Sequence, residues 1–334
     1  MTDHLDDLRT SLRSLLADHA PLAAVRDTAL AGKPRDTTLW ARLAEMGILA
    51  LPFPEDVGGA GAGQAELVVA LEETGAVVLD QPLFTSVALA GQLLAETAAG
   101  SDLLPAIAAG QIRATVAELT DHQVLRGVPE AANSQVLLAT DGVRVVRIDL
   151  DQSGVTIRPT DALDPTRPCA DVLLEDARVE TLAEDAAGVA RWRLKALLAN
   201  AAEQAGVGRT SLTLATEYAK LRVQFDKPIG AQQSIQHLLA EVLHATVGAE
   251  ASVRQAAKAL DEGRADAPEL VTVAAAHGSE AVQQATAALI QVHGGIGFTW
   301  EHDAHLLYRR AHSSATFLGG AAARRRELAS ILAL

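Results

Sequence analysis

Residues 291–310 read QVHGGIGFTWEHDAHLLYRR, and this stretch decides how the rest of the chain is interpreted. Its three glycines, Gly294, Gly295 and Gly297, interrupt a sequence that otherwise has the composition of helix on both sides. Each glycine in a helix interior is less favourable than alanine by about 1 kcal/mol. The cluster therefore marks either a turn between two helices or a place where bare backbone approaches something else.

A turn between two helices explains part of this pattern. A long preceding helix would end here, with one of the first two glycines as a left-handed C-terminal cap. Thr299 would cap the next helix, with Glu301 and Asp303 in its first turn, where the helix dipole favours acidic side chains. Gln291 and Gly297 have no role in such a turn, so we expect the backbone here to lie close to a ligand.

Histidines also gather in this stretch, as His293, His302 and His305. A metal site would need further ligands facing them, and Asp303 is the nearest candidate. The polarity of an exposed helix explains these residues more simply. The sequence therefore predicts no metal site.

A second stretch, residues 221–237, reads LRVQFDKPIGAQQSIQH. Arg222 and Lys227 bracket a phenylalanine, and Gly230 separates them from a helix that opens near Gln233. An arginine can give a phosphate two parallel charged hydrogen bonds, and the start of a helix points free amides at an anion. The stretch predicts either a phosphate contact or an ordinary helix–helix corner with a solvated arginine.

Hydrophobic periodicity divides the chain into three regions. The first has helical spacing with short breaks, and the second has short runs rich in Val, Ile and Leu, separated by Asp, Gly and Pro, that predict strands. The third returns to long amphipathic helices. We predict an α+β, mainly α fold with an N-terminal helical domain (1–112), a small antiparallel β domain (113–182) and a C-terminal four-helix bundle (183–334).

The composition excludes several classes of protein. A net charge of −14 argues against nucleic-acid binding through bulk electrostatics, and Cys169, the one cysteine, allows no internal disulfide. The GGAGAG run at 58–63 lacks the glycine spacing of a dinucleotide-binding loop, so it is interpreted as a plain loop. No uncharged run approaches the roughly 18 residues of a membrane span, and the N-terminus does not resemble a signal peptide. We expect a cytoplasmic protein.

Taken together, these stretches resemble the acyl-CoA dehydrogenase family, flavoproteins built from helices, a β domain and a four-helix bundle. The resemblance covers nearly the whole chain, and its two most specific signatures lie in the bundle about 70 residues apart. The matching segments are LWARLAEMGILALPFPEDVGGAGAG, ATVAELTD, TDALDPTRPCADVLLEDARV, EYAKLRVQFDKPIGAQQSIQHLLAE and QVHGGIGFTWEHDAHLLYRRA.

The resemblance implies FAD as cofactor, with contacts that reach a flavin held mainly by a neighbouring subunit. The residues that it places at the flavin are Arg222, Phe225, Gln233, Gln291, Gly294, Gly295 and Thr120. Two positions depart from the family pattern: Asp226 replaces a glycine, and Gln232 replaces a phenylalanine. The loop and the tryptophan-bearing strand with which family members hold their own flavin ring are eroded around Thr120.

The family's catalytic glutamate is missing. Its motif falls on Leu318, Gly319 and Gly320, and the alternative base position on the first bundle helix falls near Ala196. Because general base catalysis contributes roughly 10²–10⁴ in rate, a chain without a positioned carboxylate is expected to be a poor dehydrogenase. Glu203, two helical turns beyond Ala196, is the one candidate base that the sequence offers.

Three interpretations stay open on this basis. The chain is a subunit of a hetero-oligomer whose partner supplies the base; or a homo-oligomeric flavoenzyme with a displaced base or altered flavin chemistry; or a non-catalytic scaffold. The resemblance implies an acyl-CoA or acyl-carrier thioester as substrate, an electron-transfer partner and a tetramer-like homo- or hetero-oligomer. It implies no nucleic acid and no membrane span.

Overall fold

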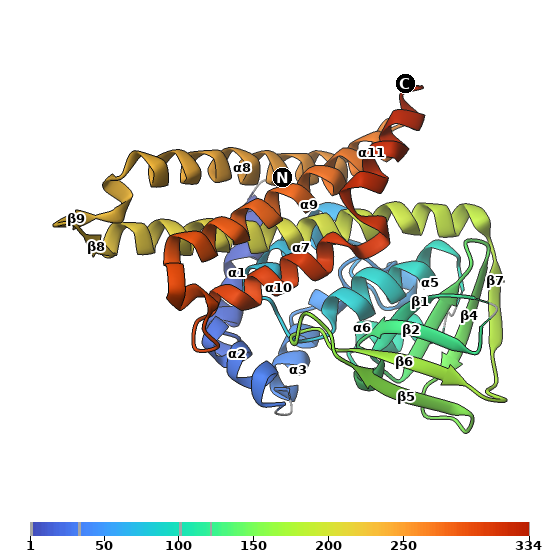
Figure 1. Cartoon of the computed structure of the whole chain (residues 1–334). Helices are drawn as coiled ribbons and strands as arrows, with labels where there is room; N and C mark the ends of the chain where they lie inside the picture. The colour runs from blue at the N-terminus through green and yellow to red at the C-terminus, as the bar shows by residue number, and fades with distance from the viewer. Residues whose placement is uncertain (1–2, 33–34, 100–101, 121, 334) are drawn as a thin grey trace. The chain divides into compact units, whose positions relative to one another are not determined.

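The computed structural model describes residues 3–32, 35–99, 102–120 and 122–333 (Figure 1). The chain forms two compact units, and each is described here by itself. One unit comprises Met1–Lys33, Val68–Leu79 and Leu197–Leu334, and the other comprises Pro34–Leu67 and Asp80–Ala196. The three predicted domains are continuous ranges of the sequence, whereas each compact unit combines segments that are far apart in the sequence. The bounds of the three domains stay a prediction.

The first unit is helical. Two of its long helices, α8 and α9, pack along one another, and Val242 of α8 and Ala285 of α9 belong to one buried apolar cluster (Figure 1). The sequence predicts both Val242 and Leu243 on the apolar face of α8; Val242 is buried, but Leu243 is 51% exposed. The helices are α1 (Asp3–His19), α2 (Leu22–Ala31), most of α4 (Gln64–Ala76), most of α7 (Ala186–Leu221), α8 (Gln233–Asp261), α9 (Ala267–His293), α10 (Ala304–Ala315) and α11 (Gly320–Ile331).

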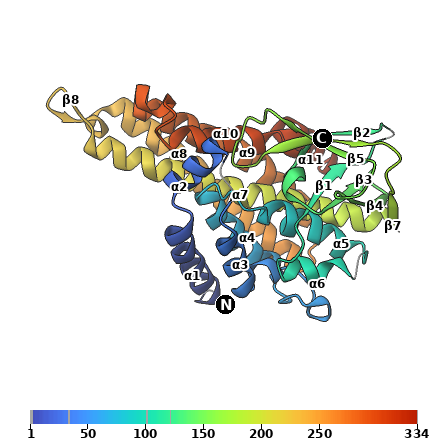
Figure 2. The same ribbon diagram turned by 90° about the horizontal axis from the view of Figure 1, so that it is seen from below.

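Helices α4 and α7 cross at very close range (Figure 2). A Cβ atom added at Gly75 of α4 would overlap the carbonyl group of Glu203, lying 3.0 Å from its carbon. A Cβ atom at Gly206 of α7 would overlap the carbonyl group of Glu72, lying 2.8 Å from its carbon. Glycine at both positions therefore lets the two backbones touch. This crossing fixes the position of Glu203.

Buried charges surround the same crossing. Arg9 of α1 donates hydrogen bonds to Glu72 and Glu73 at 2.7 Å each, and Arg209 of α7 donates to Glu73 at 2.8 Å. Burial raises the pKa of Glu72. At Glu73, burial also opposes ionisation, but hydrogen bonds from Arg13 and the charge of Arg209 outweigh it and lower the pKa. The network ties α1 and α7 to α4.

The second unit carries two sheets that pack face to face. Side chains from both sheets, among them Leu125, Leu137, Ile148 and Val172, form one buried apolar cluster. The helical segments are α3 (Thr37–Glu45), the π-helical η3 (Phe84–Gly91), α5 (Gln92–Glu96) and α6 (Leu103–Ala108), and the strands are β1 (Ala114–Glu118), β2 (Val124–Pro129), β3 (Val136–Thr140), β4 (Arg144–Asp149), β5 (Val155–Thr160), β6 (Cys169–Leu174) and β7 (Glu180–Glu184).

The strand order is β1-β3-β4-β7 in one sheet and β2-β6-β5 in the other. Within these two sheets β1 and β3 pair in parallel, with Ala114 opposite Val136, and the other pairs are antiparallel. The predicted small antiparallel β region is therefore present, with one parallel pair that the sequence does not reveal. Residues 58–63 lie in a loop, as expected. Among the described helices, none is long and apolar enough to cross a membrane.

Candidate functional site

The first signature stretch forms an exposed hairpin at the end of α7. Helix α7 ends at Leu221, and β8 (Val223–Gln224) pairs with β9 (Lys227–Pro228) (Figure 1). Phe225 and Asp226 make the turn, with φ of 54° and 62°. Two successive positive φ values are typical of a two-residue hairpin turn, which usually contains Asn or Gly. This hairpin was missed from the sequence, because Phe-Asp is not a typical turn pair.

Cationic and polar side chains of this hairpin face solvent. Arg222 and Lys227 are exposed, and no described carboxylate lies within ion-pair distance of either. Helix α8 begins at Gln233, which is exposed, after the N-cap residue Gln232. Phe225 is 88% exposed, which is unusual for a phenylalanine. The hairpin thus presents an unpaired arginine and a bare aromatic ring beside a helix start.

The second signature stretch contains two kinds of glycine. Helix α9 ends at His293, and the amide of Gly294 (φ 62°) donates to the carbonyl oxygen of Ile290. A Cβ atom at Gly294 or Gly295 would meet no described atom within 4 Å. At Gly297 it would lie 3.1 Å from the Cβ atom of His293. Gly297 is therefore needed for packing inside the chain, which corrects the expectation that it approaches a ligand, and the open backbone is at the first two glycines.

The predicted cap at Thr299 was wrong. The hydroxyl of Thr299 donates back to the carbonyl oxygen of Ile296, and α10 starts later, at Ala304. The ring nitrogen Nδ1 of His302 accepts the amide hydrogen of Ala304 at 3.1 Å. His302 thus does the capping that was expected of Thr299, and Asp303 precedes the helix.

The predicted exposure of the histidines was also wrong. His305 is only 7% exposed and lies with its ring 5.0 Å from that of Trp300, and His293 is equally buried. Burial lowers the pKa of both, which keeps them neutral near pH 7. No group of three or more possible metal ligands occurs within the described ranges.

The two signature stretches contact each other. The ring of Tyr218, near the end of α7, stacks on the ring of His293 with centroids 4.1 Å apart. Tyr218 lies four residues before Arg222, and His293 follows Gln291, which is exposed on the last turn of α9. The stack therefore holds together the helix ends that carry Arg222 and the open glycines.

These residues fit the phosphate end of a flavin nucleotide. Open glycine backbone lets a phosphate approach closely, and an unpaired guanidinium supplies the matching charge. Phe225 and Gln291 add an exposed ring and an exposed amide. Thr120 lies in the other compact unit, exposed just after β1, and no described hydrogen bond involves its side chain. It is described only within that unit.

Glu203 lies in the interior of the helical unit. Its side chain is 4% exposed, and Arg310 of α10, 1% exposed, donates to Oε1 at 3.0 Å. The hydroxyl of Ser314 donates to Oε2 at 3.3 Å. Arg310 also donates to the carbonyl oxygen of Leu79 at 3.1 Å. Both carboxylate oxygens are therefore engaged, and Glu203 would have to leave Arg310 in order to take a proton.

No carboxylate occupies either family base position. Leu318 stands in the motif that follows α10, with φ of 52° and ψ of 28°, a conformation that is rare for leucine. Arg324 of α11 donates to its carbonyl oxygen at 2.9 Å and so holds this turn. Ala196 is fully buried. The turn at Leu318 is therefore held by a hydrogen bond, although it carries no carboxylate at the position of the family's catalytic glutamate.

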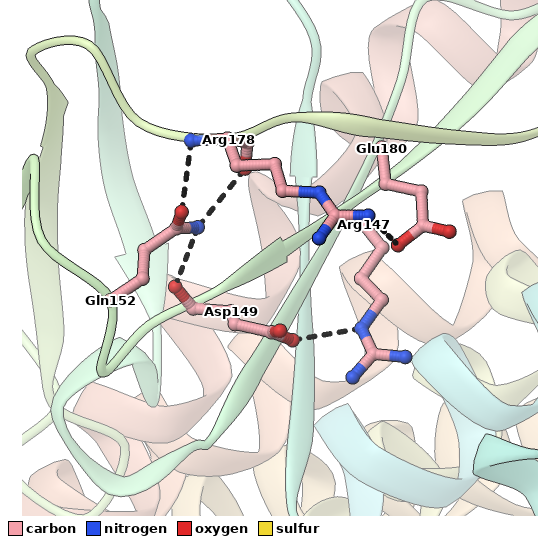
Figure 3. Close-up of a pocket in the computed structure, with 5 residues that line it drawn as sticks. All are labelled: Arg147, Asp149, Gln152, Arg178 and Glu180. Carbon is pink, nitrogen blue, oxygen red and sulfur yellow. Dashed lines mark hydrogen bonds and ion pairs between the residues drawn. The ribbon is translucent and has the colours of Figure 1, made fainter.

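A polar hollow in the second unit is a weaker candidate (Figure 3). Arg147 lies 2.8 Å from Asp149, and the side chain of Gln152 donates to the carbonyl oxygens of Asp149 and Arg178 at 3.0 Å each. Arg178 lies 3.9 Å from Glu180. Because opposite charges face one another, the hollow has no net charge with which to select an ionic ligand.

Glu203's partners and the stacked rings were missed from the sequence. Arg310 and Ser314 are one helical turn apart on α10, and that spacing could have suggested that they share a partner. No sequence signal pairs Tyr218 with His293, because the contact joins different helices.

Comparisons with known proteins match most of the chain to one family. The N-terminal domain of acyl-CoA dehydrogenases matches residues 2–111, and their C-terminal domain matches residues 189–332. The acyl-CoA dehydrogenase IpdE2 of Mycobacterium tuberculosis is 35% identical over 314 residues, covering 93% of this chain and 92% of the relative.

Solved structures also match the fold of this chain. A chain of the ChsE4–ChsE5 complex of M. tuberculosis superposes with a TM-score of 0.89 at 25% identity, over 100% of this chain and 98% of that one. The Tcur3481–Tcur3483 steroid ACAD G363A variant superposes with a TM-score of 0.89 at 28% identity. The match covers 99% of this chain and 98% of that one. The predicted fold class and the predicted kinship with these oxidoreductases are confirmed. This chain is a member of the acyl-CoA dehydrogenase family.

Proposed function

We propose that this chain is one subunit of a hetero-oligomeric acyl-CoA dehydrogenase-like flavoprotein that oxidises an acyl thioester at its α and β carbons, with FAD. The observation that carries this proposal is an asymmetry. The phosphate half of a flavin site is open and unpaired at Arg222, Gly294 and Gly295, whereas Leu318 and Ala196 stand at the base positions. A partner chain would supply the glutamate.

The chain's own contribution is to bind and orient the nucleotide. Arg222 would hold a phosphate through paired charged hydrogen bonds, the backbone of Gly294 and Gly295 would lie along it, and Phe225, Gln233 and Gln291 would contact the adenosine side. Thr120, just after strand β1, would contact a flavin from the unit that carries the sheets. When bound, FAD supplies the hydride acceptor, and an electron-transfer partner would reoxidise it. The thioester is acyl-CoA or an acyl carrier, and the assembly is tetramer-like and cytoplasmic.

An exposed apolar surface supports a partner subunit. Interfaces between permanently associated subunits are more apolar than other surfaces, so exposed large apolar side chains are candidates for such a contact. In the helical unit, exposed large apolar residues occur at the end of α7, on the hairpin, on α8 and on the stretch between α9 and α10. They are Leu221, Val223, Phe225, Leu243, Val247, Ile296, Phe298 and Trp300. The ChsE4–ChsE5 relative is itself a complex of two different chains.

Flavin content tests the proposal. Expressed alone, the chain is expected to carry little FAD, because half of the site is missing. Co-expressed with the partner dehydrogenase subunit and co-purified, the complex should show the flavin absorbance bands and oxidise acyl-CoA. A yellow, fully loaded homo-oligomer with that activity would instead support a displaced base or altered flavin chemistry. Absence of flavin in both preparations would support a scaffold.

Arg222→Ala is expected to weaken FAD retention by the complex about 10- to 100-fold, because a charged hydrogen bond contributes roughly 1.5–3 kcal/mol. Equilibrium dialysis of the complex against FAD measures the effect. Lys220→Ala is the matched control, since Lys220 is an exposed cation only two residues earlier. Equal loss in both variants would show that Arg222 contributes only general charge.

A further inference from the structure

The stretch between α9 and α10, which we name the glycine turn (residues 294–303), depends on contacts at its two ends. At its start, the stack of Tyr218 on His293 fixes the end of α9. Three large apolar side chains in its middle are at least half exposed: Ile296, Phe298 and Trp300. Because segments with few buried contacts open locally, the shape of the turn depends strongly on what holds its far end.

Arg26 of α2 holds that far end. Its Nη1 donates to the carbonyl oxygen of Glu301 and to the carboxylate of Asp303, both at 2.7 Å. The side chains of Arg26 and Asp303 are 18% and 26% exposed, so water screens this pair less than a pair on the open surface. Hydrogen bonds between charged groups are also shorter and stronger than neutral ones. One guanidinium therefore fixes two points of the turn.

Asp303 does not cap its own helix. It stands immediately before α10, where an aspartate usually accepts hydrogen bonds from the first helical amides. No described hydrogen bond joins its carboxylate to those amides, and His302 accepts the Ala304 amide instead. The carboxylate of Asp303 is therefore directed at α2 rather than at α10.

The sequence of α2 places Arg26 beside the turn. The helix starts after Pro21 and is closed by Gly32, which has a left-handed φ of 60°. Val25, the residue before Arg26, is 3% exposed and anchors the helix in its unit. On its other side Arg26 pairs with Asp27 at 3.2 Å, and that aspartate is 62% exposed. The guanidinium is thus oriented between Asp27 and the glycine turn.

We propose that Arg26 is a positioning residue for the nucleotide site, which holds the glycine turn in the shape that leaves the backbone of Gly294 and Gly295 open. It acts through Glu301 and Asp303 rather than by touching the nucleotide. A turn that is already ordered loses less conformational freedom when a phosphate binds, so binding is tighter. This consequence for the nucleotide rests on the proposed function.

Amide hydrogen exchange of the full chain, without cofactor, tests the Arg26 contact. In Arg26→Ala, protection of peptides from the glycine turn is expected to fall about tenfold, because a charged hydrogen bond is lost. Peptides from α8 should keep their native protection, which separates local loosening from a general loss of stability. Asp303→Asn should lower protection of the turn about threefold, because Arg26 can still bond to the Glu301 carbonyl. This milder variant decides the matter if Arg26→Ala does not fold.

Asp27→Asn is the matched control. It removes the other ion-pair partner of the same guanidinium, on the same helix, and leaves the contacts with the turn in place. Protection of the glycine turn should change less than about twofold, because the pair with this exposed aspartate contributes little. Unchanged protection in Arg26→Ala, an equal fall in Asp27→Asn, or a fall that extends equally to α8 would overturn the proposal.

FAD binding by the co-expressed complex tests the consequence. Arg26→Ala should raise the dissociation constant of FAD about 3- to 10-fold, whereas turnover per bound flavin should stay native, because no reacting atom is touched. A variant that only destabilised the chain would reduce the amount of folded complex without this split. A looser turn with unchanged FAD affinity would overturn the role of Arg26 at the nucleotide site. If the native complex binds no FAD, the proposed function fails, while the exchange experiment still decides whether Arg26 holds the turn.

Discussion

Glu203→Gln is expected to lower the free energy of unfolding by about 1.5–3 kcal/mol. The substitution leaves the shape of the side chain nearly intact but removes the charge opposite Arg310. That guanidinium is 1% exposed and lies 3.0 Å from the carboxylate of Glu203. The charged hydrogen bond from Arg310 would become a weaker one to a neutral amide, and the Ser314 hydroxyl would also lose an anionic acceptor. Denaturant unfolding of the full chain measures the change.

Glu280→Gln is the matched control for this prediction. Glu280 pairs with Arg325 at 2.5 Å, but the two side chains are 44% and 64% exposed. Because water and salt screen exposed pairs, the same chemical change there should alter the free energy of unfolding by less than about 1 kcal/mol. If both variants lose the same small amount, the buried pair does not stabilise the fold as described.

The same variant decides whether Glu203 acts as a base. If its role is to pair with Arg310, turnover per bound flavin in the co-expressed complex should stay near the native value once unfolded protein is discounted. If it is the base, turnover should fall by roughly 10²–10⁴, and the pH profile should lose its acidic limb. The engagement of both oxygens, by Arg310 and Ser314, favours the structural role.

Periodicity predicted the elements that bury one continuous face. The helix that ends at His293 and the strand Val136–Thr140 both follow from runs of apolar residues with the matching spacing. Strand β2 does not follow from such a run, because Gly127 and Pro129 interrupt its apolar residues, although Pro129 is its last residue. The parallel pairing of β1 with β3 could not be predicted from the local sequence, since it depends on how the chain connects distant strands.

The site was predictable only where the residue type itself has chemical meaning. Glycine and arginine have distinctive roles, so the glycine cluster and Arg222 were singled out from the sequence, and the resemblance placed Gly294 and Gly295 at the flavin. The structure shows that the backbone of these two glycines is open; their contact with a flavin stays a prediction. His305 was placed on the wrong side of its helix, since a polar residue can be buried beside an aromatic ring such as Trp300. Burial depends on tertiary neighbours that the local sequence does not specify.

Gly206→Ala is expected to destabilise the chain by about 2–3 kcal/mol, although alanine is the better helix former by about 1 kcal/mol. The added methyl group would overlap the carbonyl group of Glu72 and lie 2.9 Å from the amide nitrogen of Ala76. Both are main-chain atoms of α4, so a change of rotamer cannot relieve the clash. Helices α4 and α7 would have to separate, and the midpoint of denaturant unfolding should fall accordingly.

Gly208→Ala, two residues further along α7, separates this clash from a general effect of substitution. A Cβ atom there meets nothing closer than 3.8 Å, the distance to a methyl carbon of Thr246. Alanine should therefore fill space and favour the helix, raising the free energy of unfolding by about 0.5–1 kcal/mol. Opposite signs at two glycines of one helix would show that backbone contact with α4, rather than helix propensity, requires glycine at 206. Stabilisation by both variants would contradict the close crossing and, with it, the position assigned to Glu203.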